Sequence, residues 1–116
     1  MEDDIQEMYV RARKAFETVE YWPQEKVDEM VLAAGWEWQK EETAKVLARL
    51  AVDESGIGVY EHKVAKIRSK TRGSLWNMRD AKTCGVVEQD EARGLVKIAK
   101  PMGVIANVVP CTNPES

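Results

Sequence analysis

The stretch that decides the fold is residues 103–114, Gly-Val-Ile-Ala-Asn-Val-Val-Pro-Cys-Thr-Asn-Pro. Its first seven residues form a nearly continuous apolar run, which is typical of a strand buried on both faces of a parallel sheet. Asn113 and Pro114 then provide a capping side chain and a proline for a first helical turn, with Glu115 near its positive end. A buried strand followed by a helix start opens a βαβ unit, which needs a parallel partner strand. The sequence therefore predicts an α/β fold of which this chain holds a part.

Upstream of this stretch the hydrophobic spacing is helical as far as about residue 82. Apolar residues recur every three or four positions in four segments. The predicted helices cover residues 3–20, a segment from Pro23 to the polar cluster 39–42, a segment ending at Ser55 and Gly56, and residues 59–79. The third helix is expected to turn four residues inward: Val46, Leu47, Leu50 and Ala51. Four tryptophans are expected to serve as core and helix-packing residues: Trp22, Trp36, Trp38 and Trp76.

Between the helices and the apolar run, the composition changes to β-branched residues. Residues 85–88 and 95–100 flank a polar turn at 89–94, which predicts a β-hairpin. Pro101 then separates the hairpin from the first parallel strand, expected over residues 103–109. Strands without neighbours leave backbone donors and acceptors unpaired, so we expect the chain to self-associate, most simply as a homo-oligomer.

Composition bounds the class of protein. The chain has 116 residues, of which 44% are hydrophobic and 32% charged, with a net charge of -3, as in an ordinary soluble globular domain. Its start is acidic and its longest apolar run is far shorter than the about 20 residues that span a bilayer, so we expect a cytoplasmic protein without a membrane partner. Cys84 and Cys111 are expected to be free thiols. His62 is the only histidine and is expected to be solvated, so no metal site is predicted.

The charge is distributed unevenly along the chain. Residues 1–54 hold 14 acidic and 7 basic side chains, whereas residues 55–82 hold 2 acidic and 7 basic ones. Within the basic stretch, residues 62–72, cations alternate with Val64 and Ile67 at helical spacing, as on the solvated side of an amphipathic helix. Because no aromatic residues interleave with these cations, nucleic acid is not an expected partner.

The end of the chain resembles a known family. Residues 94–105, Gly-Leu-Val-Lys-Ile-Ala-Lys-Pro-Met-Gly-Val-Ile, run into residues 109–114, Val-Pro-Cys-Thr-Asn-Pro. This Lys-Pro-x-Gly-Val motif, followed six residues on by Pro-x-Thr-Asn-Pro, resembles the start of the cofactor domain in coenzyme A-acylating aldehyde dehydrogenases. Residues 24–29, 50–56 and 63–70 match that family in character, so the resemblance covers most of the chain. It is most similar to the branch that acts on small aldehydes such as acetaldehyde and sulfoacetaldehyde.

The resemblance implies an NAD(P)-dependent oxidation of a small aldehyde to an acyl-coenzyme A. The reaction passes through a thiohemiacetal and a thioester on a cysteine, which splits one difficult step into two. In the family this cysteine lies beyond the equivalent of residue 116, and Cys111 occupies a variable position that is not the nucleophile. Residues 1–116 would then form a partial, N-terminal segment of a Rossmann-like cofactor domain. Alone, that segment is expected to be inactive and to bind neither NAD(P) nor coenzyme A firmly.

Thr112 and Asn113 are the candidate catalytic residues. Non-acylating relatives carry Pro-x-Asn-x-Pro, in which the Asn amide helps to bind the oxyanion of the thiohemiacetal. Here Thr112 stands at the middle position and Asn113 is displaced by one, so either side chain could be the donor. The alternative role for Asn113 is that of a helix N-cap.

A function of a different class is also compatible with these patterns. The chain could be a small helical interaction module that binds a partner through the free edge of its hairpin and has no catalytic role.

Overall fold

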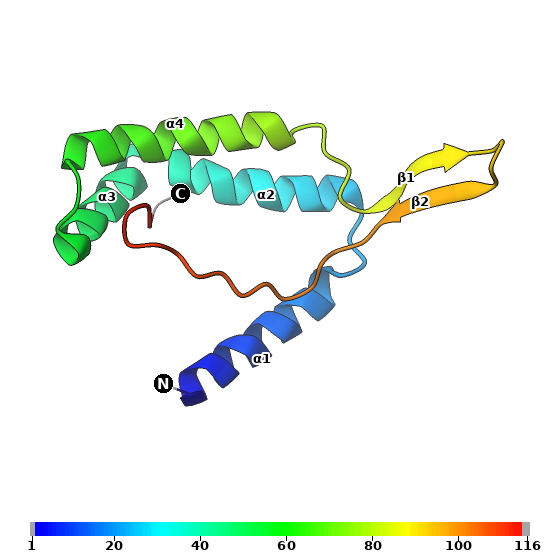
Figure 1. Ribbon diagram of the computed structural model, residues 1–116, viewed down its shortest axis with the longest axis horizontal. Helices are drawn as coiled ribbons and strands as arrows, with labels where there is room; N and C mark the ends of the chain where they lie inside the picture. The colour runs from blue at the N-terminus through cyan, green and yellow to red at the C-terminus, as the bar shows by residue number, and fades with distance from the viewer. Residues whose placement is uncertain (1, 115–116) are drawn as a thin grey trace. The chain divides into compact units, whose positions relative to one another are not determined.

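The computed structural model describes the backbone of residues 2–114 and the side chains of residues 4–114 (Figure 1). Four helices are followed by an antiparallel hairpin, which confirms the predicted order of elements with small shifts at their ends. The elements are α1 (Glu2–Val19), α2 (Gln24–Gln39), α3 (Glu41–Ser55), α4 (Tyr60–Met78), β1 (Gly85–Asp90) and β2 (Leu95–Ala99). None of these helices is both long enough and apolar enough to cross a membrane.

The chain folds as two compact units. The first comprises Met1–Val27 and Ala81–Asn107, and the second comprises Asp28–Asp80 and Val108–Ser116. The first unit therefore holds α1, the start of α2 and the hairpin. The second holds the rest of α2, α3, α4 and the turn that carries the candidate catalytic residues.

The core of the second unit lies between α3 and α4, which pack against each other (Figure 1). Ala44 and Ala48 on α3 and Ile67 on α4 are fully buried. Alanines four residues apart lie on one face of a helix, and their small side chains let the backbone of α4 approach closely. The partly buried residues that complete this contact are Leu47, Tyr60 and Val64.

The predicted inward face of α3 was therefore partly wrong. Val46 and Leu50 remain 67% and 51% exposed, whereas Ala51 is buried and Leu47 is half-buried. The face of α3 that carries Ala44 and Ala48 packs against α4 because small side chains permit a close contact between helices. Val46 and Leu50 lie on other faces of α3 and stay exposed. Gly56 ends α3 as expected, in the left-handed conformation with φ of 66°, and donates its N–H to the carbonyl of Val52.

Two contacts join α2 to α4 within the second unit. A Cβ built at Gly35 would lie 2.6 Å from Cδ1 of Leu75, so glycine allows the two helices to approach at this point. Further along, the Gln39 side-chain amide donates to the main-chain carbonyl of Arg68 at 2.8 Å. The close approach of Leu75 explains why a glycine stands at position 35, in the interior of α2.

The tryptophans do not form a core, and that prediction is corrected. Trp36 and Trp76 are 69% and 66% exposed. Basic side chains lie over two of the rings instead: Lys26 over Trp22 at 4.4 Å and Arg79 over Trp76 at 4.1 Å. Such cation–π contacts stabilise an indole that remains partly in water.

In the first unit, Gln24 joins the start of α2 to the segment that leads into the hairpin. Its carbonyl oxygen accepts hydrogen bonds from the backbone N–H groups of Thr83 at 2.8 Å and Cys84 at 3.2 Å, and its amide donates to the Thr83 hydroxyl. The hairpin itself pairs Gly85 with Ala99 and contains a bulge at Val87, after which Glu88 faces Lys97. The outer edges of this two-stranded sheet have no partner strand within residues 2–114.

Residues 103–109 are not a strand in the structure, which corrects the prediction of a first parallel strand. Their backbone belongs to no sheet, and Ile105 and Val108 are 72% and 94% exposed. A strand is stabilised by hydrogen bonds to a neighbour, and residues 2–114 offer this segment no parallel partner. The α/β class is thus represented by helices and an antiparallel hairpin, without a Rossmann-like parallel sheet among the described residues. Glu115, assigned to the following helix start, lies outside them.

The buried position of Ile67 generates a first prediction. Replacing Ile67 by Ala should lower the free energy of unfolding by about 2–4 kcal/mol, because it leaves a cavity between α3 and α4. Val46→Ala, on the exposed side of α3, should change it by less than about 0.5 kcal/mol. Urea unfolding followed by circular dichroism measures both values, and equal effects of the two variants would contradict the assigned core.

Candidate functional site

The candidate site is built on the turn at residues 110–114. The backbone N–H of Asn113 donates to the carbonyl of Pro110 at 3.3 Å, which closes the turn. Thr112 and Asn113 are both exposed, and Pro114 is half-buried. The turn therefore presents two polar side chains to solvent while Pro114 packs towards the helices.

A hydrogen bond ties this turn to α4. The Lys66 ammonium donates to Oδ1 of Asn113, and the two atoms are 2.6 Å apart. Because the amide oxygen accepts this bond, the amide nitrogen of Asn113 is left as the donor on the other side of the group. Within residues 4–114, the Thr112 hydroxyl makes no hydrogen bond to another side chain or to the backbone. Either side chain could therefore donate to an incoming oxygen.

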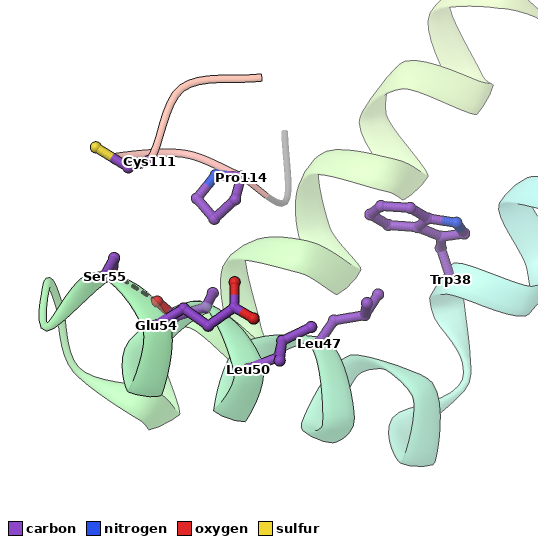
Figure 2. Close-up of a pocket in the computed structure, with 8 residues that line it drawn as sticks. Trp38, Leu47, Leu50, Glu54, Ser55, Cys111 and Pro114 are labelled. Atoms are coloured by element: carbon purple, nitrogen blue, oxygen red, sulfur yellow. Dashed lines mark hydrogen bonds between the residues drawn. The ribbon is translucent and has the colours of Figure 1, made fainter. Parts of the chain in front are cut away.

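Beside the turn lies a pocket of about 250 Å³ (Figure 2). In Figure 2, Cys111 and Pro114 of the turn lie over the leucines and the C-terminal end of α3, and Trp38 stands at the other end of the pocket. The pocket is mostly apolar, which suits a small carbon chain better than a charged group. Its lining residues are Trp38, Leu47, Leu50, Ala51, Glu54, Ser55, Cys111 and Pro114.

Two nucleophile-bearing side chains line this pocket, Ser55 and Cys111. The Ser55 hydroxyl donates to the carbonyl of Ala51 at 2.5 Å and accepts from the N–H of Ile57 at 3.1 Å, so it caps the end of α3. Cys111 is exposed and, like Cys84, is a free thiol, as predicted. His62 is exposed on α4 and is not one of the residues that line the pocket. This arrangement contains no base paired with either nucleophile.

Acidic and basic side chains at the junction of α2 and α3 shift each other's pKa values in the direction that favours their charged forms. Hydrogen bonds from Lys40 and Thr43 lower the pKa of Glu37. A hydrogen bond and the charge of Lys45, with a smaller effect of Arg68, lower the pKa of Glu41, and Glu41 raises the pKa of Lys45. A carboxylate with a lowered pKa stabilises the fold above its ordinary pKa, and that stabilisation is lost as the pH falls through the lowered value.

An acidic side chain on α3 partly complements the basic stretch of α4. The Arg68 guanidinium lies 3.9 Å from the Glu41 carboxylate, and Lys63 is buried. No group of three or more metal-ligating side chains occurs in the part of the chain that the structure describes. The residue that sequence reasoning missed is Lys66, which lies 47 positions from Asn113, so that no local motif could have linked the two.

Comparisons with known proteins match this chain to coenzyme A-dependent aldehyde dehydrogenases. It is 40% identical over 112 residues to the sulfoacetaldehyde dehydrogenase (acylating) of Bilophila wadsworthia, a match that covers 97% of this chain and 24% of that enzyme. It is 41% identical over 114 residues to the succinate-semialdehyde dehydrogenase (acetylating) of Clostridium kluyveri, with the same coverage of both chains. It is 35% identical over 113 residues to the bifunctional aldehyde-alcohol dehydrogenase AdhE of Escherichia coli, with 97% of this chain and 12% of that protein covered.

These matches confirm the resemblance read from the sequence: the chain corresponds to an N-terminal segment of acylating aldehyde dehydrogenases. The chain spans about a quarter or less of the length of these relatives. No protein-family model matches the chain.

Proposed function

We propose that this chain forms the N-terminal part of an acylating aldehyde dehydrogenase that oxidises a small aldehyde to an acyl-coenzyme A with NAD(P). The observation that carries the proposal is the match over 97% of the chain to enzymes named for sulfoacetaldehyde and succinate semialdehyde. The small volume of the pocket beside the turn supports a small substrate.

In this proposal the turn stabilises negative charge on the substrate. When a cysteine thiolate adds to the aldehyde carbon, the carbonyl oxygen becomes an oxyanion that needs hydrogen-bond donors already in place. The Asn113 amide nitrogen and the Thr112 hydroxyl are side-chain donors that the turn presents to solvent. One such donor is worth about 3–4 kcal/mol of transition-state stabilisation.

The remaining chemistry belongs to other parts of the complete enzyme. NAD(P) accepts the hydride and coenzyme A supplies the thiol that takes up the acyl group, and we assign no residue of this chain to either group. We accordingly propose that the 116 residues alone are inactive and bind neither compound firmly.

The oxyanion role generates a second prediction, tested in the complete enzyme that contains this chain. Replacing Asn113 or Thr112 by Ala, whichever is the donor, should lower the rate of acylation by about 10²- to 10³-fold with little effect on nucleotide binding. Asn107→Ala, which removes an exposed amide from the preceding irregular segment, is the matched control and should acylate normally. Pre-steady-state acylation rates and melting temperatures measure these outcomes.

The result that would sink the oxyanion assignment is equally specific. If both turn variants acylate normally but melt earlier, by an amount corresponding to about 1 kcal/mol, then Asn113 acts only as a helix cap.

We further propose that the protein is a homo-oligomer whose subunits meet at the hairpin. The support is the two-stranded sheet, whose edges lack a partner strand in residues 2–114, and the exposure of Val96 and Ile98 on β2, which are 53% and 56% exposed. The alternative function, an interaction module without catalysis, would use the same edge for a different protein.

Sedimentation equilibrium tests this third prediction. The chain should associate as its concentration rises, and the double replacement of Val96 and Ile98 by Lys should weaken association at least tenfold, because charges on an edge strand oppose pairing. Val46→Lys, at a similarly exposed position on α3, should associate like the unaltered chain. A chain that stays monomeric at every concentration, or a Val46→Lys variant that alone dissociates, would contradict the hairpin interface.

A further inference from the structure

A short hydrogen bond between Lys66 and Asn113 links the candidate site to α4 of the helical core. The two residues are 47 positions apart and belong to the same compact unit, and their side chains meet at 2.6 Å. The hydrogen bond that closes the turn itself is longer, 3.3 Å between Asn113 N and Pro110 O. The turn therefore depends on α4 for the orientation of its amide.

An ammonium group has only donors, so it can bind an asparagine side chain only through the amide oxygen. Oxygen and nitrogen lie on opposite sides of the amide carbon, so a bond from Lys66 to Oδ1 directs the Nδ2 protons the other way. Without this bond the amide could rotate and present its oxygen, which would repel an oxyanion.

Lys66 is well placed to hold this orientation because the fold fixes its backbone. It immediately precedes Ile67, which is fully buried against α3, and its side chain is half-buried. The hydrogen bond is charge-assisted and short, and such a bond polarises the amide so that its N–H groups become stronger donors.

We propose that Lys66 is a positioning residue for Asn113: its ammonium holds the amide oxygen so that the amide nitrogen faces the developing oxyanion. The inference rests on the proposed oxyanion role of Asn113. It assigns a functional residue to the basic stretch of α4, beyond the solvation expected from its sequence.

A spectroscopic experiment on the 116-residue chain tests the contact itself. In nitrogen-15-labelled protein, Lys66→Met should shift the Asn113 side-chain amide resonances and speed the exchange of their protons with water. Lys66→Arg, which keeps a cationic donor, should restore most of the shift. Lys70→Met, at an exposed position one turn further along α4, is the matched control and should leave these resonances unchanged. Unchanged Asn113 resonances in Lys66→Met, or equal changes in Lys70→Met, would overturn the proposal.

A kinetic experiment on the complete enzyme tests the consequence. Lys66→Met should slow acylation by about 10- to 100-fold without a matching change in KM for the nucleotide, and Lys66→Arg should recover part of the rate. In the double variant with Asn113→Ala, loss of Lys66 should cause no further slowing, because its effect passes through Asn113.

The kinetic outcomes separate the two claims. If Asn113→Ala is slow and Lys66→Met acylates normally, the positioning role is refuted and the oxyanion role stands. If Asn113→Ala itself acylates normally, the oxyanion role of Asn113 fails, and the catalytic part of the inference fails with it.

Discussion

The contact of two alanines on α3 with one isoleucine on α4 is the constraint on which the second unit depends. Ala44, Ala48 and Ile67 are its fully buried hydrophobic residues, and the helices approach closely because the alanines are small. This contact fixes the rotation of α4, and hence where the Lys66 ammonium lies. It also sets which leucines of α3 reach the pocket beside the turn. Thus a small core determines the geometry of the candidate site.

Much of this architecture could be predicted from local pattern. Helical periodicity located all four helices, because amphipathic spacing is a property of neighbouring residues, and the β-branched segments around a polar turn located the hairpin. Thr112 and Asn113 became candidates through a motif that resembles acylating aldehyde dehydrogenases, and their catalytic role stays a proposal. The inward face of α3 was harder to predict, because alanine contributes little hydrophobicity and its advantage lies in the close approach of a second helix.

The remaining differences arise from interactions between distant parts of the chain. Residues 103–109 have the composition of a buried strand, yet a strand requires hydrogen-bond partners that residues 2–114 do not provide. The bond from Lys66 to Asn113 joins residues far apart in sequence, so only the folded chain reveals it. Both differences concern the turn at residues 110–114. The predicted strand before it, residues 103–109, is not formed, whereas the hydrogen bond from Lys66 to Asn113 joins the turn to α4.

The pairing of α3 with α4 forms the stable core of the second unit, and residues 103–109 before the candidate site belong to no sheet within residues 2–114. Native-state hydrogen exchange of the 116-residue chain, read by mass spectrometry, tests this most directly. Backbone amides around Ala48 and Ile67 should exchange slowest, and those of residues 103–109 should exchange close to the rate of an unfolded peptide. Protection of residues 103–109 equal to that of α3 and α4 would contradict it.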